Sequence, residues 1–257
     1  MIKELEKKYN LVKNKSKLII INIKQKFPLK LGKWNIWLDK ENSIASLDSY
    51  TEIFREKHHT LLPNFPRKKD LVIIDLGASD GFYTLRAREM APKSKIISVE
   101  PNPSGFSNLK RNLKANKVRN VIPVNKVVTS KNGKISFKVV RGAIEIGGVK
   151  IFGDRGWLDK KSIKKISVDS ITLETLCKKY KIKDIDLLKM DVEGNELDIL
   201  KSSKKVLERV RKVIIEYHGK KIKKEVKKFM LKRNFKILLE EKGECGDIYF
   251  IKTGMLE

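Results

Sequence analysis

The chain has little cysteine and no long apolar run. Only Cys177 and Cys245 occur among its 257 residues, far apart and without a Cys-x-x-Cys or Cys/His spacing. The sequence therefore supports neither a zinc site nor a disulfide framework. No apolar run approaches the roughly 20 residues of a membrane span, and the short run KLIIINI near the N-terminus lacks a small-residue cleavage site and reads as a strand. These absences predict a reduced, cytoplasmic protein without a transmembrane segment.

Acidic residues are scarce relative to basic ones. Lysine and arginine total 58 against 31 for aspartate and glutamate, which gives a formal charge of +27. Such a charge is compatible with nucleic acid, an anionic membrane surface or an acidic substrate as the partner. However, 47 of the 58 basic residues are lysine, whereas bidentate phosphate recognition recruits arginine. A lysine-biased proteome explains the charge as well as an anionic partner does, so nucleic acid is not favoured.

The sequence predicts that the first 66 residues form an extension that precedes the main domain. A β-hairpin is expected within residues 18–38, with its turn at Gly32, and a helix over residues 46–61 with Ser46 as the N-cap. The adjacent His58 and His59 are expected on the solvated face of that helix. Prolines at 63 and 66 then mark a linker.

Residues 67–257 alternate short apolar runs with amphipathic segments. This pattern is typical of an α/β domain with a mainly parallel sheet and helices on both faces. Strands are expected over residues 71–76, 95–100 and 185–190, and a glycine-rich insert near residues 141–165 reads as a hairpin or lid.

The first strand of that domain ends in IDLGASDGFYT. Gly77 and Gly81 allow a tight turn from strand to helix and a close approach of the backbone to a ligand, which favours a nucleotide cofactor. Glu100 closes the second strand about 20 residues later, where a carboxylate accepts hydrogen bonds from the hydroxyls of an adenosine ribose. This geometry fits both a nicotinamide dinucleotide and S-adenosylmethionine.

Charge favours S-adenosylmethionine over the dinucleotide. Asp75 and Asp80 flank the glycine loop, and the glycine spacing is not Gly-x-Gly-x-x-Gly. A pyrophosphate would be repelled by carboxylates beside its amide donors, whereas a cofactor with an amino group and a sulfonium tolerates them. The alternative is that Gly77 and Gly81 only permit a tight strand-helix connection.

Charged residues also occupy every second position at the end of the strand in LLKMDVEGNE. Lys189, Asp191 and Glu193 would project beyond the carboxyl end of a buried strand, where ligands bind in open α/β sheets. Glu216 and His218, in IIEYH, repeat this spacing on a later strand and are expected in the same crevice. Asp191 or His218 is the candidate base for a hydroxyl acceptor, and Lys189 would keep the carboxylate ionised or stabilise an alkoxide.

Plainer interpretations of these residues stay open. The same residues are equally compatible with a structural ion pair between Lys189 and Asp191. Glu196 is compatible with the role of an acid at a helix start, where it complements the helix dipole. Asp191, Glu216 and His218 would also suit a divalent ion, although the favoured interpretation contains no metal.

The four segments IDLGASDGFYT, VEPNP, LLKMDVEGNE and IIEYH, in this order and spacing, resemble the FkbM family of S-adenosylmethionine-dependent methyltransferases. The resemblance covers about residues 70–220 and implies a seven-stranded Rossmann-like methyltransferase sheet. It places the cofactor against the glycine loop and the second strand, at Asp75, Gly77, Ala78, Asp80, Gly81, Glu100, Pro101 and Asn102. Many relatives carry asparagine where this chain has Asp80.

The resemblance also implies the reaction, since the residues themselves carry no acceptor signature. It implies transfer of a methyl group to a hydroxyl, with a sugar, glycolipid or other small metabolite as the acceptor. Two alternatives stay open, an RNA methyltransferase and a catalytically inactive basic module that binds nucleic acid or a membrane surface.

Overall fold

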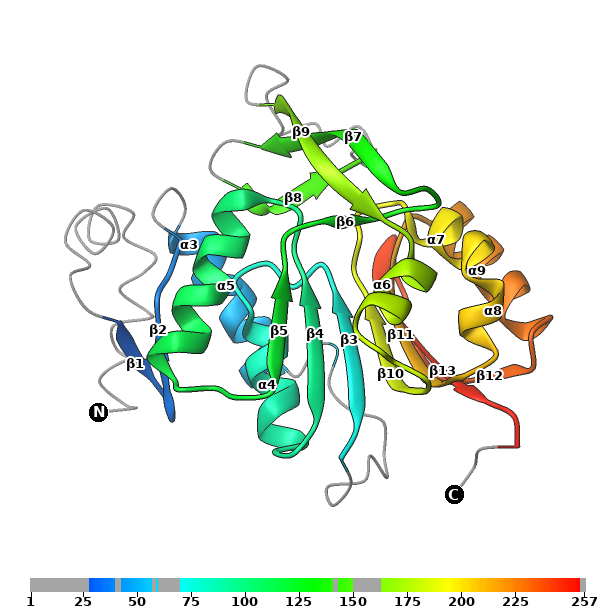
Figure 1. The fold of residues 1–257 in the computed structure, drawn as a ribbon, viewed down its shortest axis with the longest axis horizontal. Coiled ribbons are helices and arrows are strands. Elements are labelled where there is room, and N and C mark those ends of the chain that lie inside the picture. The colour runs from blue at the N-terminus through cyan, green and yellow to red at the C-terminus, as the bar shows by residue number, and fades with distance from the viewer. Residues whose placement is uncertain are drawn as a thin grey trace.

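A computed structural model of the chain describes residues 28–39, 43–56, 59, 70–140, 143–149 and 163–254. Its centre is a seven-stranded sheet with strand order β12-β13-β11-β10-β3-β4-β5 (Figure 1). The strands are β3 (Val72–Leu76), β4 (Lys95–Val99), β5 (Val121–Val124), β10 (Ile185–Met190), β11 (Val210–His218), β12 (Phe235–Glu240) and β13 (Cys245–Lys252). Within this sheet β13 runs in the direction opposite to all the other strands. The mainly parallel α/β sheet predicted from the sequence is confirmed.

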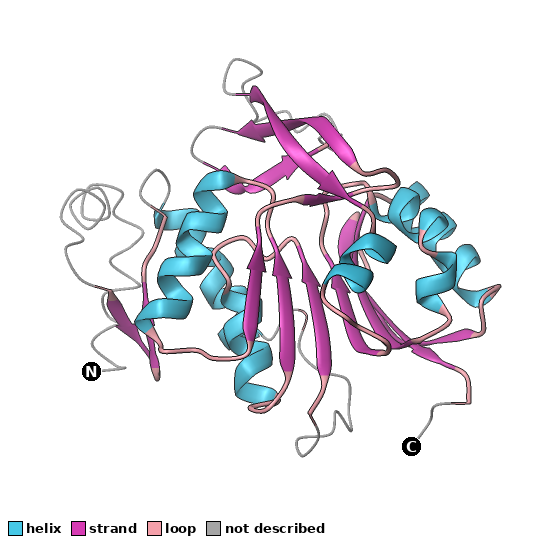
Figure 2. Ribbon diagram, viewed as in Figure 1, coloured by secondary structure: helices cyan, strands magenta, loops and turns pink. Residues whose placement is uncertain are grey.

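Helices cover both faces of this sheet (Figure 2). Successive residues of a strand point to opposite faces, so Ile73 packs into one apolar cluster and Ile74 into the other. The first cluster includes α4 (Phe82–Met90) and α5 (Pro103–Ala115), and the second includes α6 (Leu173–Lys179), α7 (Glu196–Ser202), α8 (Lys204–Leu207) and α9 (Lys220–Leu231). The strands are apolar on both sides because both faces are covered.

A second, four-stranded sheet lies over the carboxyl ends of β3, β4 and β5 (Figure 1). Its strands are β6 (Val127–Val128), β7 (Gly133–Val140), β8 (Ala143–Gly148) and β9 (Ile163–Ile171), in the order β6-β9-β7-β8. The predicted insert therefore contributes β8 and the start of β9, while residues 150–162 lie outside the described part of the chain. Its position makes this sheet a cover over the end of the main sheet where the strands finish.

The N-terminal extension forms a hairpin and a helix, as predicted. Strand β1 (Leu29–Leu31) pairs with β2 (Trp34–Ile36) around the turn at Gly32. Helix α3 (Ser43–Thr51) continues into one π-helical segment, η1 (Glu52–Glu56). The helix begins three residues before the predicted start, and Ser46 lies inside it, where its hydroxyl donates to the Asp80 carboxylate. The predicted strand at residues 17–23 and the linker prolines lie outside the described residues.

Two asparagines, one on α5 and one at its C-cap, attach the segment around β2 to the main domain. The Asn112 amide donates to the carbonyls of Trp37 (3.1 Å) and Asp80 (2.9 Å) and accepts from the Trp37 N–H (2.7 Å). Asn116 makes the equivalent pair of bonds with the backbone of Asn35, at 2.8 Å each. These side chains stand in for a neighbouring strand, because they satisfy backbone groups that would otherwise be buried without partners.

We expect Asn112→Ala to lower the free energy of unfolding by about 1–3 kcal/mol, the cost of leaving buried backbone groups without partners. Urea denaturation checks this, with Lys114→Ala as the matched control, because Lys114 is exposed on the same helix. An Asn112→Ala protein as stable as the control would show that the hairpin is not held by these bonds.

The described helices include no segment with the length and hydropathy of a membrane span.

Candidate active site

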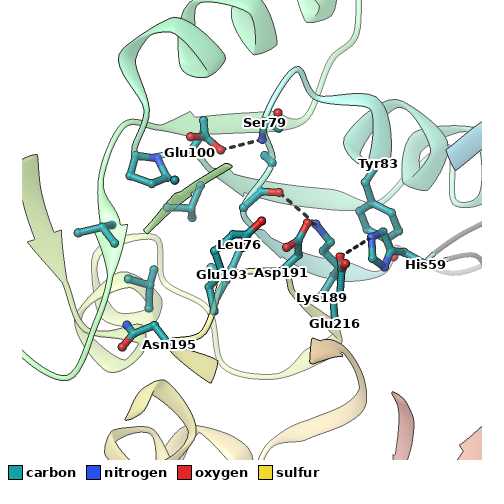
Figure 3. Close-up of a pocket in the computed structure, with 18 of the residues that line it drawn as sticks. His59, Leu76, Ser79, Tyr83, Glu100, Lys189, Asp191, Glu193, Asn195 and Glu216 are labelled. Atoms are coloured by element: carbon teal, nitrogen blue, oxygen red, sulfur yellow. Dashed lines mark hydrogen bonds and ion pairs between the residues drawn. The ribbon is translucent and has the colours of Figure 1, made fainter. Parts of the chain in front are cut away.

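A cavity of about 580 Å³ lies at the carboxyl ends of β3, β4, β10 and β11, beneath the second sheet. Its floor comes from the loops after those strands, and Val127, Val128 and Phe137 of the second sheet close it from above. The volume is in the range that holds a cofactor or a drug-sized ligand. Figure 3 shows two groups of interacting residues at this cavity: Ser79 with Glu100, and Lys189 and Asp191 with Glu216 and His59.

The glycine loop after β3 forms one wall of this cavity, and both of its glycines have a left-handed backbone. Gly77 has φ +79°, and a Cβ there would lie 1.8 Å from the backbone oxygen of Asp191. Gly81 has φ +84°, and its Cβ would lie 2.5 Å from Leu109 on α5. An L-residue is strained at such φ values, and the absence of a side chain at Gly77 allows the loop after β3 to lie against the residue that follows β10.

Glu100, at the end of β4, lies beside that loop. Its carboxylate accepts from the Ser79 amide (2.7 Å) and from the Asn102 amide (2.7 Å). Burial raises its pKa to about 8, against the opposing effect of these two hydrogen bonds. A carboxylate offers about four lone-pair sites, so each oxygen keeps one for a ligand in the cavity.

Lys189 is the buried cation at the centre of the site. Its ammonium group donates to the Gly77 carbonyl (3.0 Å) and to Asp191 (3.3 Å), and lies 3.6 Å from Asp75. Burial disfavours the charged form, but the carboxylates of Asp191, Asp75 and Glu216 outweigh it and raise the pKa of Lys189. Burial alone would raise the pKa of Asp191, but the charges of Lys189, His59 and His218 outweigh burial and lower the pKa of that carboxyl.

Glu216, on β11, lies next to Asp191 and contacts a histidine of the N-terminal extension. The Nε2 atom of His59 lies 3.4 Å from Glu216, while its Nδ1 atom is held by Asp247 on β13 at 2.8 Å. His59 is 7% exposed. Burial and the Asp191 carboxylate raise the pKa of Glu216 to about 8. The prediction that His59 lies on a solvated helix face is wrong, because Asp247 supplies a buried partner for it.

His218 repeats this arrangement on the other side of Glu216. Its Nδ1 atom contacts Glu196 at 2.7 Å, and its Nε2 atom lies 3.6 Å from Glu193 and 3.9 Å from Glu216. Burial disfavours the imidazolium, but Glu196 and Glu193 outweigh it and raise the pKa of His218 to about 10. Glu196, expected only as a helix-start acid, is fully buried at the first turn of α7 and orients this ring.

Most residues that the sequence predicts for the site line the cavity together. They are Gly77, Ala78, Asp80, Glu100, Pro101, Lys189, Asp191, Glu193, Glu216 and His218. Asp75, Gly81 and Asn102 do not line it. Asp75 lies behind Lys189 and accepts from Thr84 (2.7 Å), and Asn102 caps α5 through the Ser104 amide. The carboxylate of Asp80 accepts from Ser46 and Asn108.

Two site residues lay beyond the reach of sequence reasoning. His59 and Asp247 come from opposite ends of the chain, 188 positions apart, and meet only through the fold. The sole signal for Asp247 is an acidic residue next to the apolar run IYFI, which ordinary strands also carry.

Residues 75–237 match the model of the methyltransferase FkbM domain. The chain belongs to the FkbM methyltransferase family. Its cofactor is S-adenosylmethionine, and the fold and cofactor predicted from the sequence are confirmed.

This FkbM-family chain is similar to several characterised proteins. It is 26% identical over 203 residues to the 2-O-methyltransferase NoeI of Sinorhizobium fredii, covering 71% of this chain and 82% of that one. It is 30% identical over 163 residues to the hexuronic acid methyltransferase AglP of Haloferax volcanii, covering 63% and 62%. Among solved structures, TYW2 of M. jannaschii in complex with AdoMet is similar with a TM-score of 0.46 at 15% identity, covering 88% and 85%.

Proposed function

We propose that this FkbM-family methyltransferase transfers the methyl group of S-adenosylmethionine to a hydroxyl oxygen of a sugar, a glycolipid or a similar small metabolite. The observation that carries the proposal is the cluster of carboxylates around Lys189, beside the loop that faces Glu100. It offers proton acceptors at the cavity, which a hydroxyl needs and an amine or thiolate needs less. The names of NoeI, a 2-O-methyltransferase, and AglP, a hexuronic acid methyltransferase, support an oxygen on a sugar.

In this proposal the cofactor lies along the glycine loop, with its ribose at Glu100. The two oxygens of Glu100 already hold the amides of Ser79 and Asn102 and retain lone pairs for the ribose hydroxyls. The loop backbone from Gly77 to Ser79 would follow the rest of the cofactor and direct its sulfonium toward Asp191.

Methyl transfer from a sulfonium is an in-line displacement, so much of the rate comes from positioning the two reactants. The acceptor hydroxyl must also lose its proton. Of the two candidate bases, Asp191 fits better, because its side chain is 28% exposed and its lowered pKa keeps it ionised. His218 is buried, and its raised pKa means that it already carries a proton at neutral pH. Lys189 then acts as a positioning residue that holds Asp191 against β3.

We expect Glu100→Ala to weaken S-adenosylmethionine binding by about 1.5–3 kcal/mol above pH 8, where Glu100 is ionised, because hydrogen bonds to a charged group are lost. Calorimetric titration measures this, with Glu174→Ala as the control, since Glu174 is exposed on α6. If Glu100→Ala binds S-adenosylmethionine with unchanged affinity, Glu100 does not bind the ribose of the cofactor.

The acceptor class is tested by incubating the protein with cofactor labelled in its methyl group. The panel contains glycans, glycolipids, small hydroxylated metabolites and RNA. We expect label on a sugar-containing acceptor. Transfer to RNA alone, with binding that weakens steeply as salt rises, would replace this proposal with the RNA methyltransferase alternative.

A further inference from the structure

The residues that flank Glu216 have the chemistry of a metal site. One ligand atom each from Asp191, Glu216 and His218 lie within 4.8 Å of one another. Two carboxylates and an imidazole suit first-row divalent ions such as Mn²⁺ and Zn²⁺. We propose that Asp191, Glu216 and His218 bind a divalent cation of this kind, whose open coordination positions take two neighbouring oxygens of the acceptor. The ion takes the place of the protons on Glu216 and on the Nε2 atom of His218, which are released to solvent.

The orientation of His218 supports the site. A metal-ligating histidine commonly gives its other ring nitrogen to a carboxylate, which fixes the ring. Glu196 holds the Nδ1 atom of His218 at 2.7 Å, and this leaves Nε2 facing Glu193 and Glu216. Glu196 is fully buried and His218 is 2% exposed, so the ring is set before any ligand arrives.

The charges at the site support a cation as well. A carboxylate oxygen of Asp191 and one of Glu216 lie within 4.8 Å of each other at the cavity. Carboxyl groups also outnumber the neighbouring bases: Asp75, Asp191, Glu193, Glu196, Glu216 and Asp247 surround Lys189, His59 and His218. A cation between Asp191 and Glu216 would offset the negative charge of the two carboxylates. The local excess of carboxyl groups contrasts with the overall charge of the chain, which is +27.

The exposure of the ligands indicates where the open positions lie. The side chains of Asp191 and Glu216 are 28% and 27% exposed and both line the cavity, whereas His218 closes the buried side. Three protein ligands with an open face toward a cavity are the arrangement of a site that binds a substrate oxygen. Asp191 keeps its contact to Lys189 because a carboxylate has about four lone-pair sites.

This inference deepens the proposed function, because the use of the ion rests on a hydroxyl acceptor. It narrows the acceptor to a compound whose reacting hydroxyl has a second oxygen on the adjacent carbon, a vicinal hydroxyl or a carboxylate. Such a pair chelates the ion and fixes the hydroxyl in line with the sulfonium. The binding of the ion itself requires neither the cofactor nor the acceptor.

The test is a titration of the chelator-treated full chain with Mn²⁺ alone, followed by calorimetry and by the electron paramagnetic resonance signal of free Mn²⁺. We expect one saturable site per chain. Glu196→Gln, which changes the residue that positions His218, should weaken it about 10–100-fold, and Glu216→Gln and His218→Gln should weaken it at least as much. Glu244→Gln is the matched control, since Glu244 is exposed and paired with Lys220. Its affinity should equal that of the unchanged protein.

Two results would overturn the site. One is no saturable uptake of Mn²⁺ or Zn²⁺ by a protein that still binds S-adenosylmethionine, and the other is uptake that Glu216→Gln and His218→Gln leave unchanged. Retained cofactor binding shows that each variant is folded. If the protein takes up no ion and transfer to a sugar hydroxyl continues in excess EDTA, the metal site is refuted and the proposed function stands. If the protein takes up the ion but transfers no methyl group to any hydroxyl, the metal site stands and the proposed function is refuted.

Discussion

Asp191→Asn is expected to lower the maximal rate of methyl transfer by about 10²–10⁴, the size of a general-base contribution. The change keeps the shape of the side chain but removes the negative charge that receives the proton of the acceptor. Affinity for S-adenosylmethionine should stay nearly unchanged, because the proposed ribose contact is made by Glu100 and not by Asp191. Single-turnover transfer of a labelled methyl group measures the rate, and calorimetry measures the affinity.

The matched control for this variant is Asp198→Asn. Asp198 is exposed on α7, seven positions along the same segment, and does not line the cavity. Transfer at the full rate in Asp191→Asn would take this residue out of the mechanism. Lys189 and Asp191 would then be a structural ion pair that holds β3 against β10.

Gly77→Ala is expected to lower the free energy of unfolding by about 2–5 kcal/mol. The left-handed backbone at Gly77 costs an L-residue about 1–2 kcal/mol, and overpacking a tight contact adds about 1–3 kcal/mol. The contact is tight because a Cβ would lie 1.8 Å from the carbonyl oxygen of Asp191, a backbone atom of the residue that follows β10. Urea denaturation gives the value.

Gly254→Ala separates the two contributions. Gly254 has a similar φ of +87°, but a Cβ there has nothing within 4 Å. In Gly254→Ala the free energy of unfolding should fall only by the backbone contribution, about 1–2 kcal/mol. Equal losses in the two variants would show that the close approach of Gly77 to Asp191 has no energetic consequence.

The order of elements in the main domain follows from local sequence patterns. The runs around Ile73, Ile96 and Leu187 are short, apolar and separated by amphipathic segments, and each forms a strand of the central sheet. Spacing also explains why Lys189, Asp191, Glu216 and His218 meet, because alternate residues at the carboxyl ends of neighbouring parallel strands share one crevice. Such relations need only the period of a strand and the rule for ligand position.

The contacts that complete the site do not follow from local patterns. Asp247 pairs with His59 because β13 inserts beside β11 while the extension folds back over the sheet. Glu196 reads as a helix-start acid from its position, and its contact with His218 depends on how α7 packs beside β11. The sequence predicts Ser46 as a cap, but this residue lies inside α3, where its hydroxyl donates to the buried carboxylate of Asp80. Each is a tertiary contact that overrides a local preference.

Identification of the atom that carries the transferred methyl group tests the central proposal most directly. The product made with carbon-13-labelled cofactor is purified, and the labelled methyl group is assigned by nuclear magnetic resonance and by mass spectrometry of the hydrolysed sugar. The account predicts a methyl ether on a sugar hydroxyl that has an oxygen on the adjacent carbon. A methyl group on nitrogen, or on a nucleotide, would contradict it.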